Sequence, residues 1–492
     1  MMSKIHCFIQ AQEPETRTAF TGELSAHPAV GRIYLLGKSE PETPPDGCIF
    51  IRTDGRFGSE TMRTISRHLS GSDYAMVVTE KVPVRPGQFA IERFLSVAGD
   101  TVAGLVYSDY HDLVSGKRRP HPLIDYQQGS LRDDFDFGPV LFFSSRVLRE
   151  TVEKITETFT YAGLYRIRLK IGSDHPVVRI PEYLYTAERT DAGGAGRNLF
   201  DYLDPARREV QEEMERAVTL HLKEVGAYLA PTFREVAPEE GIFDTEATVI
   251  IPVLNRERTI ADAIGSVMRQ KAGFSFNLIV VDNHSTDRTT EIIREAGRKY
   301  ENLIHLIPER KDLGIGGCWN EAVHHPACGR FAVQLDSDDL YADETLLEQM
   351  VATFYRERCA MVIGSYRLTD FDLNEIPPGI VDHREWTAGN GRNNALRING
   401  LGAPRAFFTP VLRQVRIPNV SYGEDYAVAL AISRHYRIGR IYQPMYLCRR
   451  WEDNTDASPG LETGNRHDTY KDRLRTIELS ARIRMNRKKE GT

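Results

Sequence analysis

The chain has 492 residues, of which 41% are hydrophobic and 27% are charged, with a formal net charge of −6. This composition is typical of globular domains and excludes a disordered chain, and the acidic balance argues against a mainly nucleic-acid-binding protein. No run of about 18 apolar residues is present, so we expect no membrane-spanning helix. The six cysteines form no CxxC pair, which argues against a zinc site and favours reduced thiols in a cytoplasmic protein.

The N-terminal half repeats the plan of the C-terminal half in a weaker form. Residues 73–78 align with residues 330–335, and residues 104–108 align with residues 361–365 at the same spacing. A third block, YAGLY from Tyr161, aligns with YGEDY from Tyr422. Three blocks in one order favour an internal duplication, whereas the alternative is that two unrelated α/β halves share similar patterns.

The acidic residues of the C-terminal blocks are absent from the N-terminal ones. Residues 336–338 (Asp-Ser-Asp) correspond to residues 79–81 (Thr-Glu-Lys), and residues 424–425 (Glu-Asp) correspond to residues 163–164 (Gly-Leu). A lysine in place of a carboxylate would repel a metal cation. We therefore predict that residues 1–190 form a non-catalytic copy that serves as a scaffold or binding partner.

Residues 191–245 are predicted to be a helical linker. A glycine-rich stretch at residues 191–196 precedes Asp204 and Pro205, a pair typical of a helix start. Apolar residues then recur at helical spacing between Val210 and Val225.

Residues 246–460 follow an alternating strand and helix pattern. This alternation is typical of a mostly parallel sheet with helices on both faces, and such sheets bind ligands at the carboxyl ends of their strands. We predict strands at residues 247–252, 278–282 and 330–336, with helices at residues 259–270 and 286–300.

Three carboxylates follow the last of these strands directly. Asp336, Asp338 and Asp339 lie within four residues and repel one another unless a cation neutralises them. Mg²⁺ and Mn²⁺ take oxygen ligands, and Mg²⁺ commonly bridges one or two carboxylates and substrate phosphates. The pattern predicts a metal–diphosphate site, and the alternative is a solvated acidic turn.

Other polar motifs are weaker when taken alone. Glu424 and Asp425 could take a proton from an attacking hydroxyl, or they could simply favour a helix start through its dipole. Asp282 ends the second predicted strand, where it could accept a hydrogen bond from a nucleobase or cap the next helix. The glycine-rich loop at residues 311–320 would let backbone N–H groups approach an anion.

The order of these motifs resembles family 2 glycosyltransferases of the GT-A fold. The matching segments are residues 248–256, 279–287, 335–339 and 423–425, and the resemblance covers residues 245–460. It implies an α/β fold class with two GT-A-like, Rossmann-like domains in tandem, joined by the linker. The first would be degenerate, the second catalytic, and residues 461–492 would form a basic helical tail.

The resemblance also implies roles for individual residues. Asp425 would be the general base, with Glu424 positioning the acceptor or the leaving phosphate. Asp338 and Asp336 would hold Mn²⁺ or Mg²⁺. The implied nucleotide- and diphosphate-binding residues are Val253, Asn255, Asp282, Asp336, Arg449 and Arg450.

The sequence departs from the family pattern at three positions. Leu254 replaces an aromatic residue, and Trp319 replaces an arginine that could contact phosphate. Trp451 stands where a histidine often follows the two arginines, so a histidine metal ligand is missing there.

The resemblance implies a metal-dependent, inverting transfer of a hexosyl or N-acetylhexosaminyl group from a UDP-sugar to an acceptor hydroxyl in cell-envelope polysaccharide synthesis. The expected partners are a nucleotide sugar and a glycan or lipid-linked acceptor, with no nucleic acid, and a homodimer is a further expectation. Rival functions are a nucleotidyltransferase and a non-catalytic nucleotide-sugar sensor. The tail is expected to pack as a solvated helix, and the alternative is contact with anionic lipid at the inner membrane face.

Overall fold

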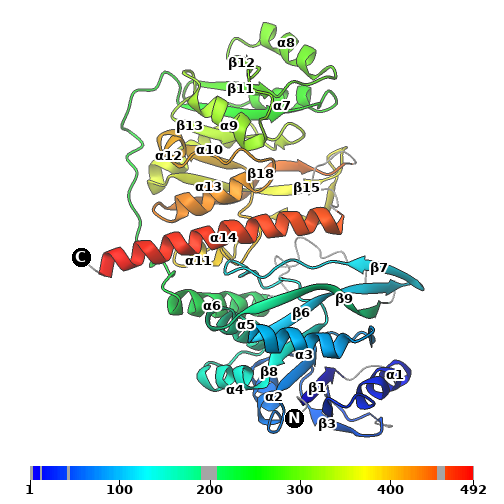
Figure 1. Ribbon diagram of the computed structural model, residues 1–492. Helices are drawn as coiled ribbons and strands as arrows, with labels where there is room; N and C mark the ends of the chain where they lie inside the picture. Colours follow the sequence, from blue (N-terminus) through cyan, green and yellow to red (C-terminus); the bar gives the residue numbers. More distant parts are fainter. Residues whose placement is uncertain (1–3, 11–13, 42–44, 190–207, 452–459, 491–492) are drawn as a thin grey trace. The chain divides into compact units, whose positions relative to one another are not determined.

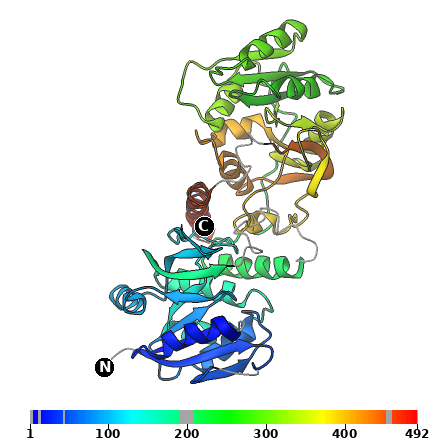
Figure 2. The ribbon, with the colours of Figure 1, turned by 90° about the vertical axis from the view of Figure 1, so that its right-hand side faces the viewer.

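The computed structural model describes residues 4–10, 14–41, 45–189, 208–451 and 460–490. The chain divides into a first unit of Met1–Tyr228 with Gly460–Thr492, and a second unit of Leu229–Pro459. Each unit contains a mixed β-sheet flanked by helices (Figures 1 and 2). The six cysteines are free, as predicted. Within the described ranges, no helix has the length and apolar character needed to cross a bilayer.

The first unit contains nine strands and seven of the described helices. The strands are β1 (Ile5–Gln10), β2 (Val30–Gly37), β3 (Cys48–Arg52), β4 (Tyr74–Val78), β5 (Val84–Pro86), β6 (Leu105–Val114), β7 (Lys117–His121), β8 (Val140–Ser144) and β9 (Val177–Arg189). The helices are α1 (Pro14–Ser25), α2 (Ser59–Arg67), α3 (Ala90–Thr101), α4 (Ser145–Lys154), α5 (Gly163–Asp174), α6 (Arg208–Glu224) and α14 (Leu461–Glu490). Strand β1 is buried along its whole length because it lies between the parallel neighbours β2 and β4.

The second unit also contains nine strands. They are β10 (Ala247–Val253), β11 (Phe276–Asp282), β12 (Leu303–Leu306), β13 (Phe331–Gln334), β14 (Leu340–Tyr341), β15 (Met361–Thr369), β16 (Glu375–Val381), β17 (Arg405–Phe408) and β18 (Ile438–Arg449). The helices are α7 (Ile260–Met268), α8 (Thr289–Lys299), α9 (Ile315–His324), α10 (Leu346–Glu357), α11 (Gly391–Asn394), α12 (Thr409–Val415) and α13 (Glu424–Ser433).

The two sheets have the same topology. The strand order is β3-β2-β1-β4-β8-β6-β9-β5 in the first unit and β12-β11-β10-β13-β17-β15-β18-β14 in the second, and the two match when each strand is replaced by its counterpart in chain order. The extra strand pairs at the same place, β7 on β6 and β16 on β15. The predicted fold class, two α/β domains in tandem, is confirmed.

Hydrogen bonds outside the strand ladders repeat as well. The backbone N–H of Ser145 donates to the carbonyl of Asp73 at 2.9 Å, and that of Thr409 donates to Arg330 at 3.0 Å. Likewise, the Tyr165 hydroxyl donates to a backbone carbonyl in the first unit, as the Tyr426 hydroxyl does in the second. These matches support the duplication that the sequence blocks indicate.

The compact units divide the chain differently from the predicted domains. Residues 191–207 of the predicted linker lie outside the described residues. Helix α6 belongs to the first unit, where Glu213 accepts hydrogen bonds from the backbone N–H groups of Thr160, Tyr161 and Ala162 at 2.9, 2.7 and 3.1 Å. Residues 229–245 belong to the second unit.

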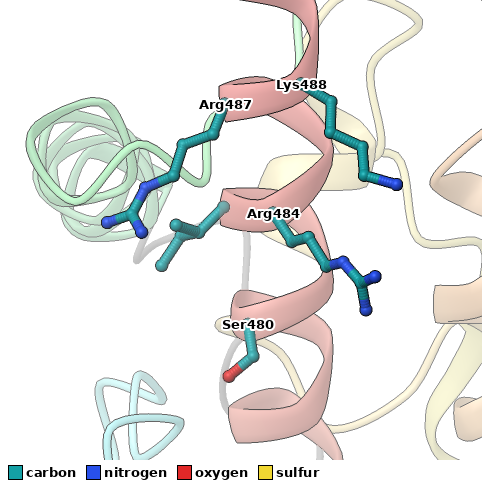
Figure 3. A pocket seen from close by; sticks show the side chains of 5 residues that line it. Ser480, Arg484, Arg487 and Lys488 are labelled. Atoms are coloured by element: carbon teal, nitrogen blue, oxygen red, sulfur yellow. The ribbon is translucent and has the colours of Figure 1, made fainter.

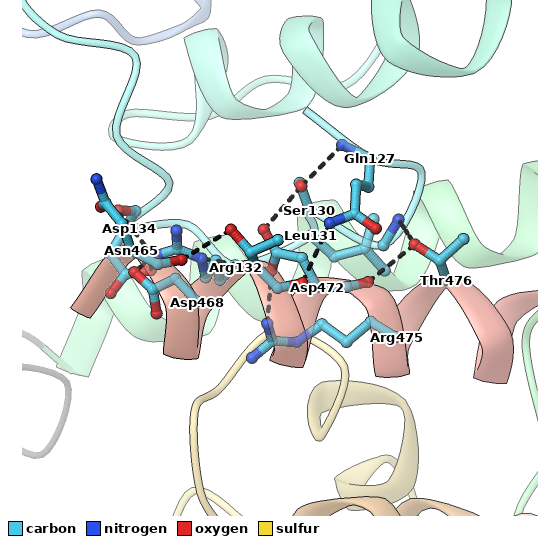
Figure 4. A network of polar contacts seen from close by, with 12 residues as sticks. Gln127, Ser130, Leu131, Arg132, Asp134, Asn465, Asp468, Asp472, Arg475 and Thr476 are labelled. Atoms are coloured by element: carbon cyan, nitrogen blue, oxygen red, sulfur yellow. Dashed lines mark hydrogen bonds and ion pairs between the residues drawn. The ribbon is translucent and has the colours of Figure 1, made fainter. Parts of the chain in front are cut away.

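The predicted tail is α14, and it belongs to the first unit (Figure 4). Ser130 donates to Asp472 at 2.8 Å, and Arg132 forms an ion pair with Asp468 at 3.0 Å. Arg475 is fully buried and pairs with Asp472 at 2.7 Å. One face of the helix is therefore buried against the first unit. Its own acids and these contacts compensate part of its basic charge.

A basic groove of about 430 Å³ lies near the C-terminal end of α14 (Figure 3). Its lining residues are Ser480, Ile483, Arg484, Arg487 and Lys488. Contact of this helix with anionic lipid stays a prediction.

Candidate active site

The acidic loop between β13 and β14 is fastened to β18. Strand β14 pairs antiparallel with β18, placing Tyr341 opposite Tyr446. The backbone N–H of Asp336 donates to the Tyr446 hydroxyl at 3.0 Å, and the backbone N–H of Arg449 donates to Oδ1 of Asp339 at 2.9 Å. The predicted diphosphate residue Arg449 therefore does lie beside the acids.

These carboxyl groups are crowded and poorly solvated. Desolvation raises the pKa of Asp336, although the positive charge of Arg405 opposes the shift. Desolvation raises the pKa of Asp339 further, and the charges of Asp338 and Asp336 add to that shift. A nearby cation would stabilise the ionised forms of these carboxyl groups.

The predicted metal ligand Asp338 faces nitrogen donors. Its Oδ2 accepts a hydrogen bond from the indole N–H of Trp451 at 3.4 Å and lies 3.8 Å from Nε of Arg256. No group of three or more His, Cys, Asp or Glu side chains in the described part of the chain could hold a metal. A cation at Asp336 and Asp338 would need its remaining ligands from substrate phosphate and water, as is common for Mg²⁺.

Glu424 and Asp425 form the first turn of α13. Oδ2 of Asp425 forms an ion pair with Nη2 of Arg405 at 2.8 Å, and its side chain is 30% exposed. Burial raises the pKa of Glu424 to about 8, and the charge of Asp425 adds to the shift. Oε2 of Glu424 is buried and has no hydrogen-bond partner among the described residues. The pair thus holds one ion-paired carboxylate and one carboxyl that is protonated at neutral pH.

Arg405 connects this pair to the acidic loop. It begins β17, which pairs antiparallel with β13. Its backbone N–H donates to Oε1 of Gln334 at 3.3 Å, and the amide of Gln334 donates to Oδ1 of Asp336 at 2.9 Å. A continuous chain of contacts therefore runs from Asp425 through Arg405 and Gln334 to Asp336.

Asp282 forms hydrogen bonds within the β11–α8 connection. It is fully buried at the end of β11, where Oδ1 accepts from the N–H of Ser285 at 2.9 Å and Oδ2 accepts from the Thr290 hydroxyl at 2.6 Å. Burial alone would raise its pKa, but hydrogen bonds from His305, Thr290 and Ser285 outweigh burial and lower it well below the usual range. Both oxygens therefore stabilise the start of the β11–α8 connection.

The remaining predicted nucleotide residues are placed as follows. Val253 is buried at the end of β10. Asn255, with a left-handed φ of 52°, accepts a hydrogen bond from the N–H of Thr286 at 2.7 Å, which ties two loops at the strand ends together. The backbone N–H of Arg450 donates to the carbonyl of Thr369 at 2.7 Å.

The sequence assigned no role to Arg256 or Trp451, and it placed Arg405 only in a region expected to line the acceptor side. No local motif marks these residues, because strand pairing brings them to the acids from segments far apart in the chain.

Trp319 is buried edge-on to Phe407, with ring centres 5.8 Å apart, so it packs in the core.

The first unit carries a different polar cluster near the ends of its matching strands. Arg189 contacts Asp112 at 2.7 Å and Glu80 at 2.8 Å. His121 lies 2.5 Å from Asp112 and 3.3 Å from Asp136. Burial lowers the pKa of His121, but the hydrogen bonds and charges of the two aspartates outweigh it and raise the pKa to about 9. We call these five residues the neutralised cluster.

Comparison with known proteins finds a family match within the second unit. Residues 248–414 match the family model described as Glycosyl transferase family 2. The chain is 27% identical over 232 residues to the minor teichoic acid biosynthesis protein GgaB of Bacillus subtilis (strain 168), covering 44% of this chain and 24% of that protein. It is 28% identical over 202 residues to UDP-Glc:alpha-D-GlcNAc-diphosphoundecaprenol beta-1,3-glucosyltransferase WfgD of Escherichia coli, covering 40% of this chain and 74% of that protein.

A solved structure of S. aureus TarS 1-349 in complex with UDP-GlcNAc is similar with a TM-score of 0.37 and 22% sequence identity, covering 44% of this chain and 61% of that chain. The chain therefore spans less than two thirds of the length of GgaB and of this structure. Residues 248–414 are thus similar to glycosyl transferase family 2.

Proposed function

We propose that the second unit transfers a sugar from a nucleotide diphosphate sugar to an acceptor hydroxyl. The observation that carries this proposal is the chain of contacts from Asp425 through Arg405 and Gln334 to Asp336. It holds a carboxylate that can accept a proton at a fixed place relative to carboxylates that suit a metal–diphosphate. Such positioning is what a reaction between two bound substrates requires.

Asp338 and Asp336 are the residues that would hold Mn²⁺ or Mg²⁺. When bound, the cation would neutralise charge on the departing diphosphate, a contribution of several kcal/mol. Arg449 lies against the same loop and adds a fixed positive charge.

Asp425 is the proposed general base. The acceptor oxygen forms a bond to the anomeric carbon, the bond from that carbon to the diphosphate breaks on the opposite face, and the hydroxyl proton passes to Asp425, so the anomeric configuration inverts. Glu424, with a pKa of about 8, holds its own proton at neutral pH and serves as a hydrogen-bond donor beside the base.

The relatives guide the choice of substrates. The name of WfgD specifies a UDP-glucose donor and a lipid-linked diphosphate acceptor, and GgaB is named for minor teichoic acid biosynthesis. We propose a UDP-sugar donor and a glycan or lipid-linked acceptor of the cell envelope. The first unit is proposed to be a non-catalytic scaffold, and a cytoplasmic location and a homodimer stay predictions.

A donor panel tests the proposal. The full-length protein is incubated with Mn²⁺ and separate UDP- and GDP-sugars, and released nucleotide is quantified. We expect slow release of UDP from one UDP-sugar. With pyrophosphate added, formation of a nucleoside triphosphate and a sugar 1-phosphate would indicate a nucleotidyltransferase, and binding without release from any donor would indicate a sensor.

A further inference from the structure

Two aromatic rings hold three arginines beside the acidic loop of the second unit. We call Arg256, Arg258, Phe371, Arg449 and Trp451 the arginine–aromatic cluster. The guanidinium carbon of Arg258 lies 4.8 Å from the Phe371 ring centre and 5.0 Å from the Trp451 ring centre. Those of Arg449 and Arg256 lie 5.3 Å from Phe371 and 5.9 Å from Trp451, respectively. The β10–α7 loop, the segment after β15 and the end of β18 supply these residues.

The cluster contacts the proposed metal ligand. The indole N–H of Trp451 donates to Asp338, and Nε of Arg256 lies 3.8 Å from the same carboxylate oxygen. The Trp451 ring that contacts Arg258 is therefore the ring that contacts Asp338. A ligand bound at Asp338 would lie within reach of the cluster.

The cluster carries more positive than negative charge. Arg449 pairs with Asp262 at 3.1 Å, and Arg256 faces Asp338. Arg258 is exposed and has no carboxylate within ion-pair distance in the described part of the chain. Nη2 of Arg449 is buried and has no hydrogen-bond partner among the described residues, a state that is unfavourable unless a ligand supplies an acceptor.

Stacking on aromatic rings orients a guanidinium without neutralising it. The ring face attracts the cation, while the N–H edge stays available to an anion. Arginine presents that edge as a planar fork that matches phosphate oxygens in a bidentate manner. Trp451 cannot ligate a metal as a histidine would, but its ring can support Arg258.

We propose that the arginine–aromatic cluster binds the diphosphate of the nucleotide-sugar donor, with Arg258 as the contacting residue. A diphosphate carries enough charge and oxygen atoms to contact both a cation held by Asp338 and the guanidinium of Arg258. The proposal rests on the proposed function, because it assumes that the acidic loop binds a metal ion and a diphosphate.

Calorimetric titration tests the assignment of Arg258. Full-length wild-type protein, Arg258→Gln and the control Arg298→Gln, an exposed arginine on α8, are titrated with UDP and with uridine, in Mn²⁺ and in EDTA. We expect Arg258→Gln to weaken UDP binding about 10- to 100-fold, the usual range for a charge-assisted contact. Uridine binding and the control should be unchanged.

Further arms separate the alternatives. Trp451→Leu should weaken UDP binding, whereas Trp451→Phe should retain it because a ring remains. Geranyl diphosphate carries the same diphosphate without a nucleoside. If Arg258→Gln weakens binding of geranyl diphosphate but not of UDP, the donor assignment is overturned.

Two further results are decisive. If UDP binds equally well to the wild type and to Arg258→Gln, the cluster proposal is wrong while the proposed function stands. If the wild type binds neither UDP nor uridine, the proposed function itself fails. Matching unfolding temperatures of the variants exclude misfolding as the cause.

Discussion

The two units share one topology but arrange charge in opposite ways at the corresponding strand ends. In the first unit, Arg189 lies between Glu80 and Asp112, so protein cations compensate the acids. In the second, Asp336 and Asp339 have raised pKa values because they are desolvated and close to Asp338. The comparison teaches that this sheet tolerates either arrangement and that the loops after the strands determine the chemistry.

The helices α5 and α13, which follow matching strands in the two units, also differ in the carboxylates at their starts. In the first unit, the Glu213 carboxylate accepts the N–H groups of residues 160–162 just before α5, a position where a helix attracts anions. At the start of α13, the chain instead places Glu424 and Asp425. The first unit therefore has the Glu213 carboxylate at a position where the second unit has Glu424 and Asp425.

Loss of the proposed base should have the largest effect. Asp425→Asn should lower turnover by about 10²–10⁴-fold, the usual contribution of a general base, with UDP affinity unchanged. Glu239→Gln is a matched control, because Glu239 also pairs with an arginine in the second unit but lies on the surface. Steady-state kinetics and titration with UDP measure both effects. Wild-type turnover by Asp425→Asn would refute its role as base.

Removal of the proposed metal ligand should have the next largest effect. Asp338→Asn should lower the Mn²⁺-dependent rate by about 10²–10³-fold, corresponding to a loss of several kcal/mol. Glu80→Gln, in the matching loop of the first unit, should leave the rate unchanged. Initial rates across a Mn²⁺ series check both variants. A lost Mn²⁺ response in Glu80→Gln would contradict the proposal that the first unit takes no part in the metal-dependent reaction.

The neutralised cluster should affect stability rather than catalysis. The folded pKa of His121, about 9, exceeds its unfolded value of 6.5, so its stabilisation is complete below pH 6.5 and is lost as pH rises through 9. His121→Gln should lower the free energy of unfolding by about 3 kcal/mol at pH 6.5, as expected for breaking a buried pair, and by less at pH 9.5. Urea unfolding at both pH values measures the difference. A deficit independent of pH would argue against a charged His121.

Glu424 should show the smallest effect, with the opposite sign. Its folded pKa of about 8 exceeds the unfolded value of 4.5, so the folded state retains a proton that the unfolded state releases, and stability falls as pH rises from 4.5 to 8. Glu424→Gln mimics the protonated form. It should stay close to the wild type near pH 5, and its advantage in the free energy of unfolding should grow as pH rises toward 8. A variant that is less stable than the wild type at pH 8 would contradict this assignment.

The sequence predicted what is local. The strand at residues 278–282 is β11, the helix at residues 259–270 contains α7, and the acidic loop follows β13 as expected. The pairing of Arg405 with Asp425 depends on β17 lying beside β13, which no short motif encodes. The assignment of α14 to the first unit depends on contacts such as Ser130 with Asp472, hundreds of residues apart.

Asp282 shows a second limit of sequence reasoning. An aspartate after a buried strand is the same pattern whether its oxygens face a ligand or the start of a helix. Only the three-dimensional arrangement shows that Ser285 and Thr290 already donate to it.

The most direct test of the contrast between the units is a crystal structure of the full chain with Mn²⁺ and UDP, with manganese located by anomalous scattering. We predict one manganese site, bounded by Asp336 and Asp338 and adjoining the diphosphate. Manganese at the neutralised cluster of the first unit, or a second unit that binds UDP without any metal at these aspartates, would contradict the account.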